Sequence, residues 1–236
     1  MGGKPGEAMR VICVIQARLG SKRLPGKVLM DIQGRPMIQH VVERAQAIRG
    51  VDQVVLNVPM TDASQFPPMT QCTVLGIRDQ EQDVLGSYLQ IAEMERADIV
   101  MRLTGDTPLI DPELCTDVLN LFLALQKNFR TFCYVANDTA RSGYPDGLDC
   151  EVVSTEALKL AAAQAIDPFE REHVMPWIRR HMPNYGILAP WGTDLAGAKW
   201  SVDTTDDLKT VRAIYSQLEP GQYGWRDTAK AWRSMT

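Results

Sequence analysis

Short apolar runs alternate with longer amphipathic runs along the chain. Four runs are mainly apolar, rich in β-branched residues and too short for a helix: 11–15, 51–58, 73–77 and 99–103. Such runs are typical of buried strands in a parallel sheet. Apolar residues recur with helical spacing in three segments: 36–48, 84–96 and 112–125. The alternation predicts an α/β fold with a largely parallel central sheet.

The second half of the chain continues this alternation with shorter pieces. The residue pattern predicts strands over 132–136, 148–153, 185–190 and 198–202, and helices over 155–165, 168–180 and 203–218. Ser154 precedes the first of these helices as its N-cap. No internal repeat or linker divides the chain. We therefore expect a flexible leader over residues 1–9 and one domain over 10–236, whose last residues, 221–236, pack on the body or on a second subunit.

The first apolar run ends in a basic loop. Residues 16–27 contain two glycines, one proline, one serine and four cations, which are Arg18, Lys22, Arg23 and Lys27. Glycine lets backbone amides approach a ligand closely, and consecutive loop N–H groups form a concavity that binds anions. In open α/β sheets the ligand crevice lies at the carboxyl ends of the strands, where this loop begins. The loop predicts a polyphosphate site, although four cations also occur on solvated surface loops.

Two aspartates follow predicted strands that are far apart in the sequence. Asp106 comes after the strand at 99–103, and Asp203 comes after the strand at 198–202. Two carboxylates at the edge of a crevice can hold Mg²⁺, which takes its remaining ligands from water and substrate phosphates. The alternative is that each aspartate caps a helix. Taken together with the basic loop, the pair favours a metal site.

Composition narrows the function classes. The chain has 236 residues, of which 45% are hydrophobic, and no apolar run approaches the roughly 18 residues of a membrane span. The net charge of −4 argues against a nucleic-acid surface. Five cysteines form no Cys-x-x-Cys pair, which predicts reduced thiols and a cytoplasmic protein. Three histidines argue against a histidine-rich zinc site.

The order of residues in the basic loop carries a family resemblance. Its seven matching residues fit the signature Arg-x-x-Ser-x-Arg-Leu-Pro-Gly-Lys: Arg18, Ser21, Arg23, Leu24, Pro25, Gly26 and Lys27. By this signature the chain resembles the SpsF-like cytidylyltransferases of spore-coat polysaccharide biosynthesis, which are related to the CMP-sialic acid and CMP-octulosonate synthetases. Further matching segments are 104–111, 144–151, 170–174 and 200–208, whereas 60–72 departs from the family.

The resemblance implies a Rossmann-like nucleotide-diphosphosugar transferase fold, with helices flanking the mainly parallel sheet. The implied reaction transfers CMP from CTP to an acidic sugar or a related small acceptor, releases pyrophosphate and uses Mg²⁺. The implied catalytic residues are Arg18, Lys27 and Asp106, and the implied metal ligands are Asp106 and Asp203. The implied nucleotide-binding residues are Ala17, Arg18, Leu19, Gly20, Ser21, Arg23, Lys27, Arg78, Arg102, Thr104 and Gly105. The implied acceptor-binding residues are Tyr144, Asp146, Gly147, Asp149, Glu151, Glu170, Arg171 and His173.

Particular roles follow from the same resemblance. Ala17 and Leu19 offer backbone groups to the base and ribose, and Arg171 or His173 binds the carboxylate of the acceptor. For these last two residues a solvated helix face and a packing histidine are the alternatives. We expect Lys22 to face solvent and the protein to be a homodimer. Other open functions are transfer from another nucleotide, a phosphorylated or phosphonate acceptor, and a non-catalytic nucleotide-binding protein.

Overall fold

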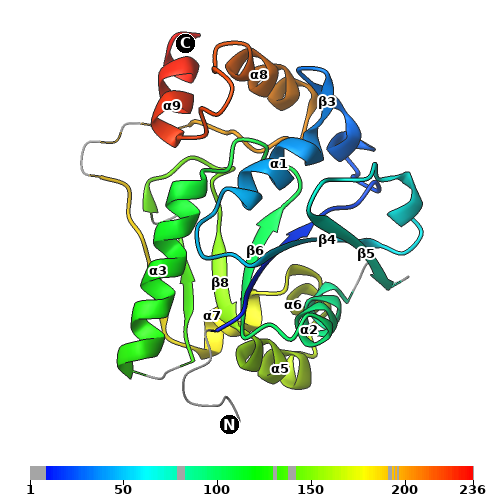
Figure 1. The fold of residues 1–236 in the computed structure, drawn as a ribbon, viewed down its shortest axis with the longest axis vertical. Coiled ribbons are helices and arrows are strands. Elements are labelled where there is room, and N and C mark those ends of the chain that lie inside the picture. The colour runs from blue at the N-terminus through cyan, green and yellow to red at the C-terminus, as the bar shows by residue number, and fades with distance from the viewer. Residues whose placement is uncertain are drawn as a thin grey trace.

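Seven strands of the described residues form one sheet in the order β5-β4-β1-β6-β8-β7-β9 (Figure 1). The computed structural model describes residues 9–78, 83–129, 132–137, 142–190, 193, 195 and 197–235, so the expected leader lies outside it except for residue 9. The strands are β1 (Val11–Gln16), β4 (Gln53–Pro59), β5 (Cys72–Arg78), β6 (Ile99–Thr104), β7 (Tyr134–Ala136), β8 (Glu151–Ser154) and β9 (Asn184–Gly186). Neighbouring strands are parallel except at β8, which is antiparallel to β6 and β7. The predicted α/β fold with a mainly parallel sheet is confirmed.

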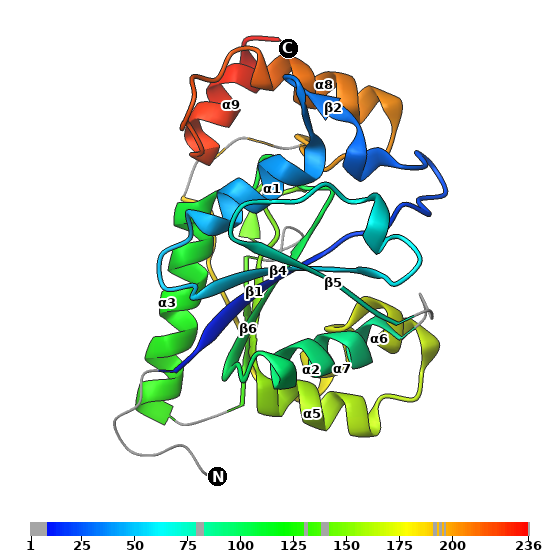
Figure 2. The same ribbon diagram turned by 45° about the vertical axis from the view of Figure 1, so that its right-hand side comes forward.

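Both faces of the sheet are covered by helices. One core cluster holds alternate residues of β1, namely Val11, Cys13 and Ile15, and the other holds Ile12 and Val14, because successive strand residues point to opposite faces. In the described part of the chain, the helices that cover the first face are α1 (Met37–Gln46) and α3 (Pro112–Phe129). Those that cover the second face (Figure 2) are α2 (Val84–Met94), α5 (Thr155–Gln164), α6 (Pro168–His173) and α7 (Pro176–His181). As predicted, Ser154 caps α5, because its side chain accepts a hydrogen bond from the amide of Ala157.

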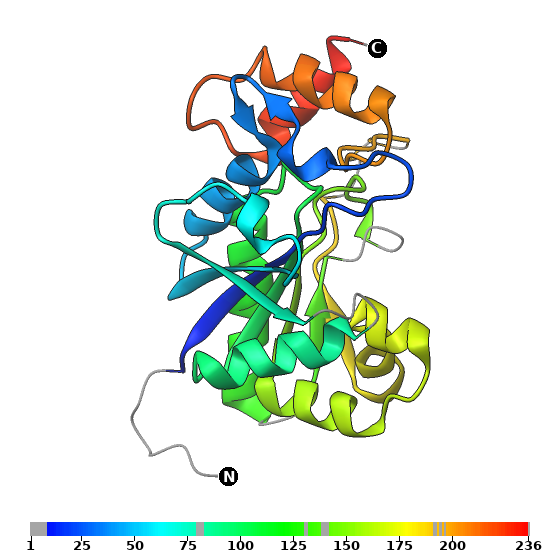
Figure 3. The ribbon, with the colours of Figure 1, turned by 90° about the vertical axis from the view of Figure 1, so that its right-hand side faces the viewer.

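A third cluster packs around the fully buried side chain of Trp200. It joins α8 (Thr205–Tyr215) and α9 (Trp225–Arg233) to the hairpin of β2 (Asp31–Ile32) and β3 (Arg35–Pro36). Figure 3 shows these elements at one end of the molecule, opposite α2 and α5. The C-terminal residues therefore pack on the body of the same chain, which is the first of the two predicted alternatives.

The order of the strands reverses between β1 and β6. After β1 the chain forms β4 and β5 on one side, and it then returns to place β6 on the other side of β1. Ligands of open α/β sheets bind at such a switch point, outside the carboxyl ends of the strands. At this point Gly105 approaches β1 so closely that a Cβ atom would lie 2.8 Å from the Cβ of Ala17. A larger residue at position 105 would push the two strand ends apart.

Three predicted elements differ from the structure. The helix over 168–180 is divided into α6 and α7 at Val174, whose φ of 69° is incompatible with a continuous helix. The strand over 185–190 is reduced to β9. The strand over 198–202 is wrong, because the amides of Trp200 and Ser201 both donate to the single carbonyl of Asp146, at 2.7 and 3.2 Å. A chain whose amides converge on one carbonyl does not form a ladder.

Between β4 and β5, in the segment that departs from the family, the chain forms only the short 3-10 helix η2 (Ala63–Gln65). A second such helix, η1 (Lys27–Leu29), ends the basic loop. All five cysteines are free, and burial raises the pKa of Cys13, Cys115 and Cys150, so these thiols stay protonated. Within the residues described above, every helix is too short or too polar to cross a membrane.

Candidate active site

A cleft of about 700 Å³ opens at the carboxyl ends of β1 and β6. It extends from the basic loop after β1 to the end of α6. Much of the predicted site lines it: Ala17, Arg18, Gly20, Ser21, Arg23, Lys27, Thr104, Gly105, Asp106, His173 and Asp203. The structure thus brings together residues from four separate segments of the sequence. Lys22 also borders this cleft, and its side chain is exposed as expected.

The basic loop folds back on Leu19. The carbonyl of Leu19 accepts hydrogen bonds from the amides of Ser21 and Gly26, both at 2.9 Å. Gly26 has a φ of 69°, in the left-handed region that favours glycine, and the amide of Lys27 closes the turn on the carbonyl of Leu24 at 3.2 Å. The Pro25–Gly26 turn therefore directs Lys27 back into the molecule rather than out to solvent.

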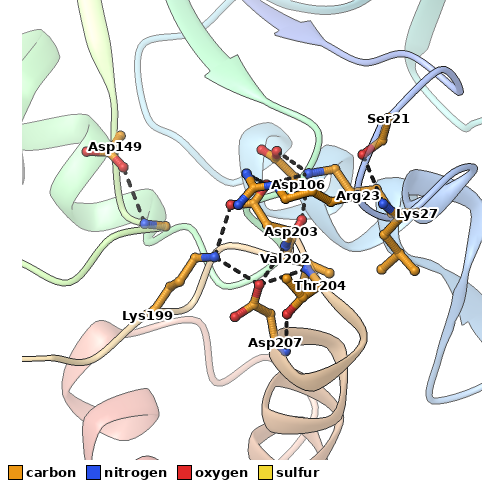
Figure 4. Close-up of polar contacts among 12 residues, drawn as sticks. Ser21, Arg23, Lys27, Asp106, Asp149, Lys199, Val202, Asp203, Thr204 and Asp207 are labelled. Carbon is orange, nitrogen blue, oxygen red and sulfur yellow. Dashed lines mark hydrogen bonds and ion pairs between the residues drawn. The ribbon is translucent and has the colours of Figure 1, made fainter.

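Lys27 contacts Asp106, Val202 and Asp203 within the site (Figure 4). Its side chain is buried, and its ammonium donates three hydrogen bonds: to Asp106 Oδ2 at 2.7 Å, to Asp203 Oδ1 at 3.0 Å and to the carbonyl of Val202 at 2.6 Å. An ammonium has three N–H donors, so each has a partner. Lys27 thereby connects the basic loop to both predicted metal ligands.

The two aspartates are brought together by backbone pairing. The amide of Val202 donates to the carbonyl of Asp106 at 2.8 Å, which places the residues that follow β6 beside those that precede α8. Neither aspartate caps a helix. Asp111 caps α3 through bonds from the amides of Glu113 and Leu114, and Thr204 caps α8. The alternative that Asp106 and Asp203 are helix caps is therefore wrong.

This carboxylate pair fits a magnesium ion. Both carboxylates lie within hydrogen-bond distance of one ammonium group, so a single small cation could contact both. In the part of the chain that the structure describes, no group of three or more His, Cys, Asp and Glu side chains could hold a metal. Mg²⁺ is commonly bound by one or two carboxylates together with water and substrate phosphates. Asp106 and Asp203 are the residues that could hold it.

Two residues of the site were not predicted from the sequence. Lys199 donates to Asp203 Oδ2 at 3.0 Å and to Asp207 Oδ2 at 2.8 Å. Asp207 also accepts the backbone amides of Asp203 and Thr204, at 2.9 and 2.8 Å. Partial burial alone would raise the pKa of Asp207, but the hydrogen bonds from Lys199 and these amides lower it to about 2. The i, i+4 spacing of Lys199 and Asp203 suits a helix rather than this extended segment. Asp207 carried a sequence signal only as part of the matching segment 200–208.

The cations of the loop differ in their surroundings. Arg23 forms an ion pair with Asp203 Oδ1 at 2.9 Å, although 65% of its side chain is exposed. Arg18 lies across the cleft beside Glu172 of α6, with 3.5 Å between the charged atoms. Next to Glu172, the exposed ring of His173 packs against Phe169 at 4.4 Å between centroids. Arg18 and Arg23 therefore stand at the mouth of the cleft, whereas Lys27 lies at its floor.

A second cavity of about 300 Å³ adjoins the cleft at Thr104, which borders both. A chain of hydrogen bonds links the two spaces. Arg102 donates to Gln16 of the cleft at 3.2 Å and to Glu151, and Glu151 accepts the Tyr134 hydroxyl at 2.7 Å. Burial alone would lower the pKa of Arg102, but the Glu151 carboxylate raises it. Of the predicted acceptor residues, Asp149 and Glu151 border this second cavity.

Other predicted acceptor residues lie outside both spaces. Glu170 is buried and accepts a hydrogen bond from Arg180 at 2.7 Å. Arg171 donates to Asp83 at 2.9 Å and to two carbonyls at the end of α5, so its guanidinium joins helices instead of facing the cleft. Tyr144 packs edge-on against Trp225, at 5.5 Å between ring centroids.

Three further predicted residues contribute backbone contacts within the protein, and a fourth has a side chain outside the described part of the structure. Asp146 holds the segment 200–201 through its carbonyl. Gly147, with a φ of 106°, lies so close to this segment that a Cβ atom would be 2.4 Å from the amide nitrogen of Ser201. The backbone amide of Leu19 donates to Asp62 and its carbonyl accepts two amides of the loop, so both groups have partners within the protein. Arg78 ends β5, and its side chain is outside the described residues.

A basic loop, a carboxylate pair and a bordering polar cavity at the switch point of an α/β sheet are features that suit a nucleotide. Residues 12–227 match the cytidylyltransferase family, and the chain belongs to this family. The resemblance that rests on the loop signature is confirmed at this level.

Several relatives match most of the chain. An uncharacterized protein of Methanocaldococcus jannaschii is 31% identical over 219 residues, which are 89% of this chain and 84% of that protein. The spore coat polysaccharide biosynthesis protein SpsF of Bacillus subtilis is 29% identical over 220 residues, 88% of this chain and 87% of that protein. The 3-deoxy-manno-octulosonate cytidylyltransferase of Escherichia coli is 30% identical over 184 residues, 76% of this chain and 72% of that protein.

Solved structures share the fold. A cytidylyltransferase from Leptospira borgpetersenii superposes with a TM-score of 0.84 at 24% identity, over 97% of this chain and 95% of that chain. The CMP:2-keto-3-deoxy-manno-octonic acid synthetase complexed with CTP superposes with a TM-score of 0.62 at 22% identity, over 88% of this chain and 99% of that chain. The predicted fold is that of the cytidylyltransferases.

Proposed function

We propose that this enzyme transfers CMP from CTP to a hydroxyl group of an acidic sugar and releases pyrophosphate. The observation that carries the proposal is the Lys27 ammonium, held between Asp106 and Asp203 at the floor of a cleft with Arg18 and Arg23 at its mouth. Cations and carboxylates arranged in this way suit a triphosphate and its counter-ion. Relatives named as octulosonate cytidylyltransferases and SpsF support both the nucleotide and the acidic sugar.

In the proposed reaction the acceptor oxygen attacks the α-phosphorus of CTP in line with the bond to the β-phosphate. The new P–O bond forms as the bond to pyrophosphate breaks, and the hydroxyl proton passes to water. Arg18 and Arg23 bind the phosphate oxygens, and Lys27 exchanges one of its three hydrogen bonds for a phosphate oxygen. The three cations stabilise the negative charge that builds on the phosphates. The protein's contribution is to position the two substrates and to supply fixed positive charge.

Mg²⁺ is the proposed cofactor, with Asp106 and Asp203 as its ligands. When bound, it neutralises charge on the triphosphate and on the departing pyrophosphate. Lys27 already lies between the two carboxylates and keeps them on one side of the cleft. The role of the protein here is to hold two carboxylates in place before the nucleotide arrives.

We propose that the acceptor binds in the second cavity, because Thr104 borders both this cavity and the nucleotide cleft. Its walls carry Asn137, Asp149 and Glu151, which suit the hydroxyl groups of a sugar. Arg179 also borders the cavity and supplies a cation for an acceptor carboxylate. Among the predicted acceptor residues, His173 is the one that lines the nucleotide cleft itself.

The proposal is tested by release of pyrophosphate. Purified enzyme with Mg²⁺ is incubated with each of the four nucleoside triphosphates and with 3-deoxy-manno-octulosonate, a sialic acid, a neutral sugar or a sugar phosphate. We expect turnover with CTP and one of the acidic sugars. Turnover with another nucleotide would show that CTP is not the donor. Turnover with the sugar phosphate and with no acidic sugar would show that the acceptor is not an acidic sugar. Binding of CTP without turnover on any acceptor would favour the non-catalytic alternative.

We also propose that the enzyme is cytoplasmic and forms a homodimer. Five free cysteines support a cytoplasmic enzyme, because such thiols persist in a reducing compartment. Leu160, Ile166 and Phe169 expose apolar side chains on and after α5, and these support a homodimer. Sedimentation at micromolar concentration distinguishes the dimer from a monomer.

A further inference from the structure

The segment between β4 and β5, which departs from the family in sequence, contacts the basic loop. The carboxylate of Asp62 accepts a hydrogen bond from the backbone amide of Leu19, with 2.8 Å between nitrogen and Oδ2. Figure 2 shows the segment beside the loop, to the right of β1. Leu19 is the residue on which the loop folds, because its carbonyl accepts the amides of Ser21 and Gly26. One side chain therefore holds the centre of the loop.

The position of Asp62 is unusual for an aspartate at the start of a helix. It directly precedes η2, where an aspartate side chain ordinarily accepts an amide of its own helix. Here the side chain makes no such bond and instead reaches 43 residues back along the chain to Leu19. The bond is charge-assisted and therefore stronger than a neutral one. Asp62 acts on the loop rather than on its own helix.

Packing fixes the segment that carries Asp62. Phe66 is buried in the core beneath it, and Ala63 packs at the edge of the same core. Gly76 of β5 allows the segment to lie close, because a Cβ atom there would be 2.9 Å from the Cα of Met60. A contact of that length with backbone would force the segment outward. Core packing and a glycine on β5 thus determine where the Asp62 carboxylate stands.

We propose that Asp62 is a positioning residue of the nucleotide site, which fixes the basic loop through the amide of Leu19 before CTP binds. The inference rests on the proposed function for the identity of the nucleotide. Its consequence is that the loop cations are presented in place, so less ordering is required when the triphosphate arrives. Removing the Asp62 carboxylate, which accepts the hydrogen bond, frees the Leu19 amide and loosens the turn that ends at Lys27.

A matched control exists at the other end of β1. Asp52 accepts the amide of Val11 at 2.7 Å, the same kind of bond with no contact to the loop. The experiment compares the parent, Asp62→Ala, Asp62→Asn and Asp52→Ala. Hydrogen exchange of residues 18–27 is measured in the ligand-free proteins, and CTP affinity is measured by calorimetry with Mg²⁺. Asn keeps an acceptor oxygen, so Asp62→Asn is the conservative rescue.

We expect Asp62→Ala to exchange the amides of Leu19, Ser21 and Gly26 at least tenfold faster and to bind CTP about tenfold more weakly. Asp62→Asn should restore most of both, and Asp52→Ala should change neither, even if its melting temperature falls. Equal exchange of the loop in Asp62→Ala and Asp52→Ala would overturn the inference. Faster exchange in Asp62→Ala, together with a parent that binds no CTP, would overturn the proposed function and leave the positioning role of Asp62 in place.

Discussion

At the scale of single residues, the loop cations are distinguished by how they are held. Lys27 is fixed by three hydrogen bonds at the floor of the cleft, Arg18 lies beside Glu172, and Lys22 is exposed. Lys27→Ala and Arg18→Ala should each lower kcat/KM for CTP by roughly 10²-fold or more, because triphosphate charge is left unpaired. Lys22→Ala should stay within a few-fold of the parent enzyme. Steady-state kinetics with CTP as the varied substrate measures all three.

Melting temperatures of the same variants distinguish a loss of catalysis from a loss of stability. Lys27→Ala also removes the shared partner of Asp106 and Asp203, so its melting temperature is measured beside its activity. The variant Asp106→Asn tests the carboxylate partner of Lys27. We expect its kcat/KM for CTP to fall by roughly 10²-fold or more while the fold stays intact. Small and equal losses at Arg18, Lys22 and Lys27 would mean that the loop is only a basic surface.

Lys199 provides the second prediction at this scale. It holds the oxygen of Asp203 that faces away from Lys27, and Asp207 anchors it in turn. Lys199→Met should therefore let the Asp203 carboxylate rotate, raise the Mg²⁺ concentration for half-maximal rate and lower kcat/KM about tenfold. Lys199→Arg should recover most of the rate, because a guanidinium can bridge both carboxylates.

The control for Lys199 lies on α8. Lys209 forms an exposed ion pair with Asp206, so Lys209→Met makes the same change in net charge away from the cleft. Exposed pairs contribute little, and this variant should behave as the parent. If the two lysine variants lose equal activity, the effect of Lys199 is one of general charge and not of position.

At the scale of elements, most of the sheet could be predicted from the sequence, because buried strands have a simple pattern of apolar residues. Strands such as β1 and β6 are buried on both faces and appear as continuous apolar runs. Helix starts were equally readable where Ser154 or a proline marks them. The break at Val174 was not readable, since the apolar spacing continues across it and only a backbone angle divides α6 from α7.

The candidate site was predictable where residues lie next to the ends of elements, and not where tertiary contacts decide. Lys27 begins η1, Asp106 follows β6 and Asp203 precedes the N-cap of α8, so the topology brings them together. Arg171 and Glu170 match the family string, yet their partners, Asp83 and Arg180, are set by helix packing. No local pattern reports such pairings.

Helix α9 is attached to the body by a buried arginine of α1. Arg44 is 1% exposed and donates to the carbonyls of Ile110 and Tyr223, at 3.0 and 2.8 Å. Arg44→Leu should destabilise the protein by about 3 kcal/mol, because two buried carbonyls lose a charged donor. Urea unfolding measures this loss, and limited proteolysis should show cleavage before α9. Arg226→Leu, at an exposed arginine over the ring of Trp225, should stay within about 0.5 kcal/mol of the parent.

At the scale of the whole molecule, the sheet body and the end that carries α8 are joined at His40. Its ring is buried on α1, its Nε2 lies 2.8 Å from the carbonyl of Ile32 in β2, and it packs on Tyr215 of α8 at 4.6 Å. Burial lowers the pKa of His40 below its usual value of 6.5, an effect that the bond to Ile32 opposes and the charge of Arg35 reinforces. The folded protein therefore holds this ring neutral.

The consequence is a stability that depends on pH. Above pH 6.5 the ring is neutral in both folded and unfolded chains, and His40 gives no slope. As the pH falls below 6.5, the unfolded chain takes up a proton that the folded one resists, so stability is lost until the lowered pKa is passed. The slope from one such group reaches at most about 1.4 kcal/mol per pH unit. Urea unfolding at pH 7, 6 and 5 measures it.

His40→Gln keeps a side-chain amide that can donate to Ile32 and removes the titrating ring. We expect this variant to be less stable than the parent at pH 7, because the packing on Tyr215 is lost, and to lose less further stability between pH 7 and 5. His181→Gln, at an exposed ring stacked on Trp177, is the matched control and should keep the slope of the parent. A parent and a His40→Gln variant with parallel pH profiles would show that the acid sensitivity of the fold arises elsewhere than at this junction.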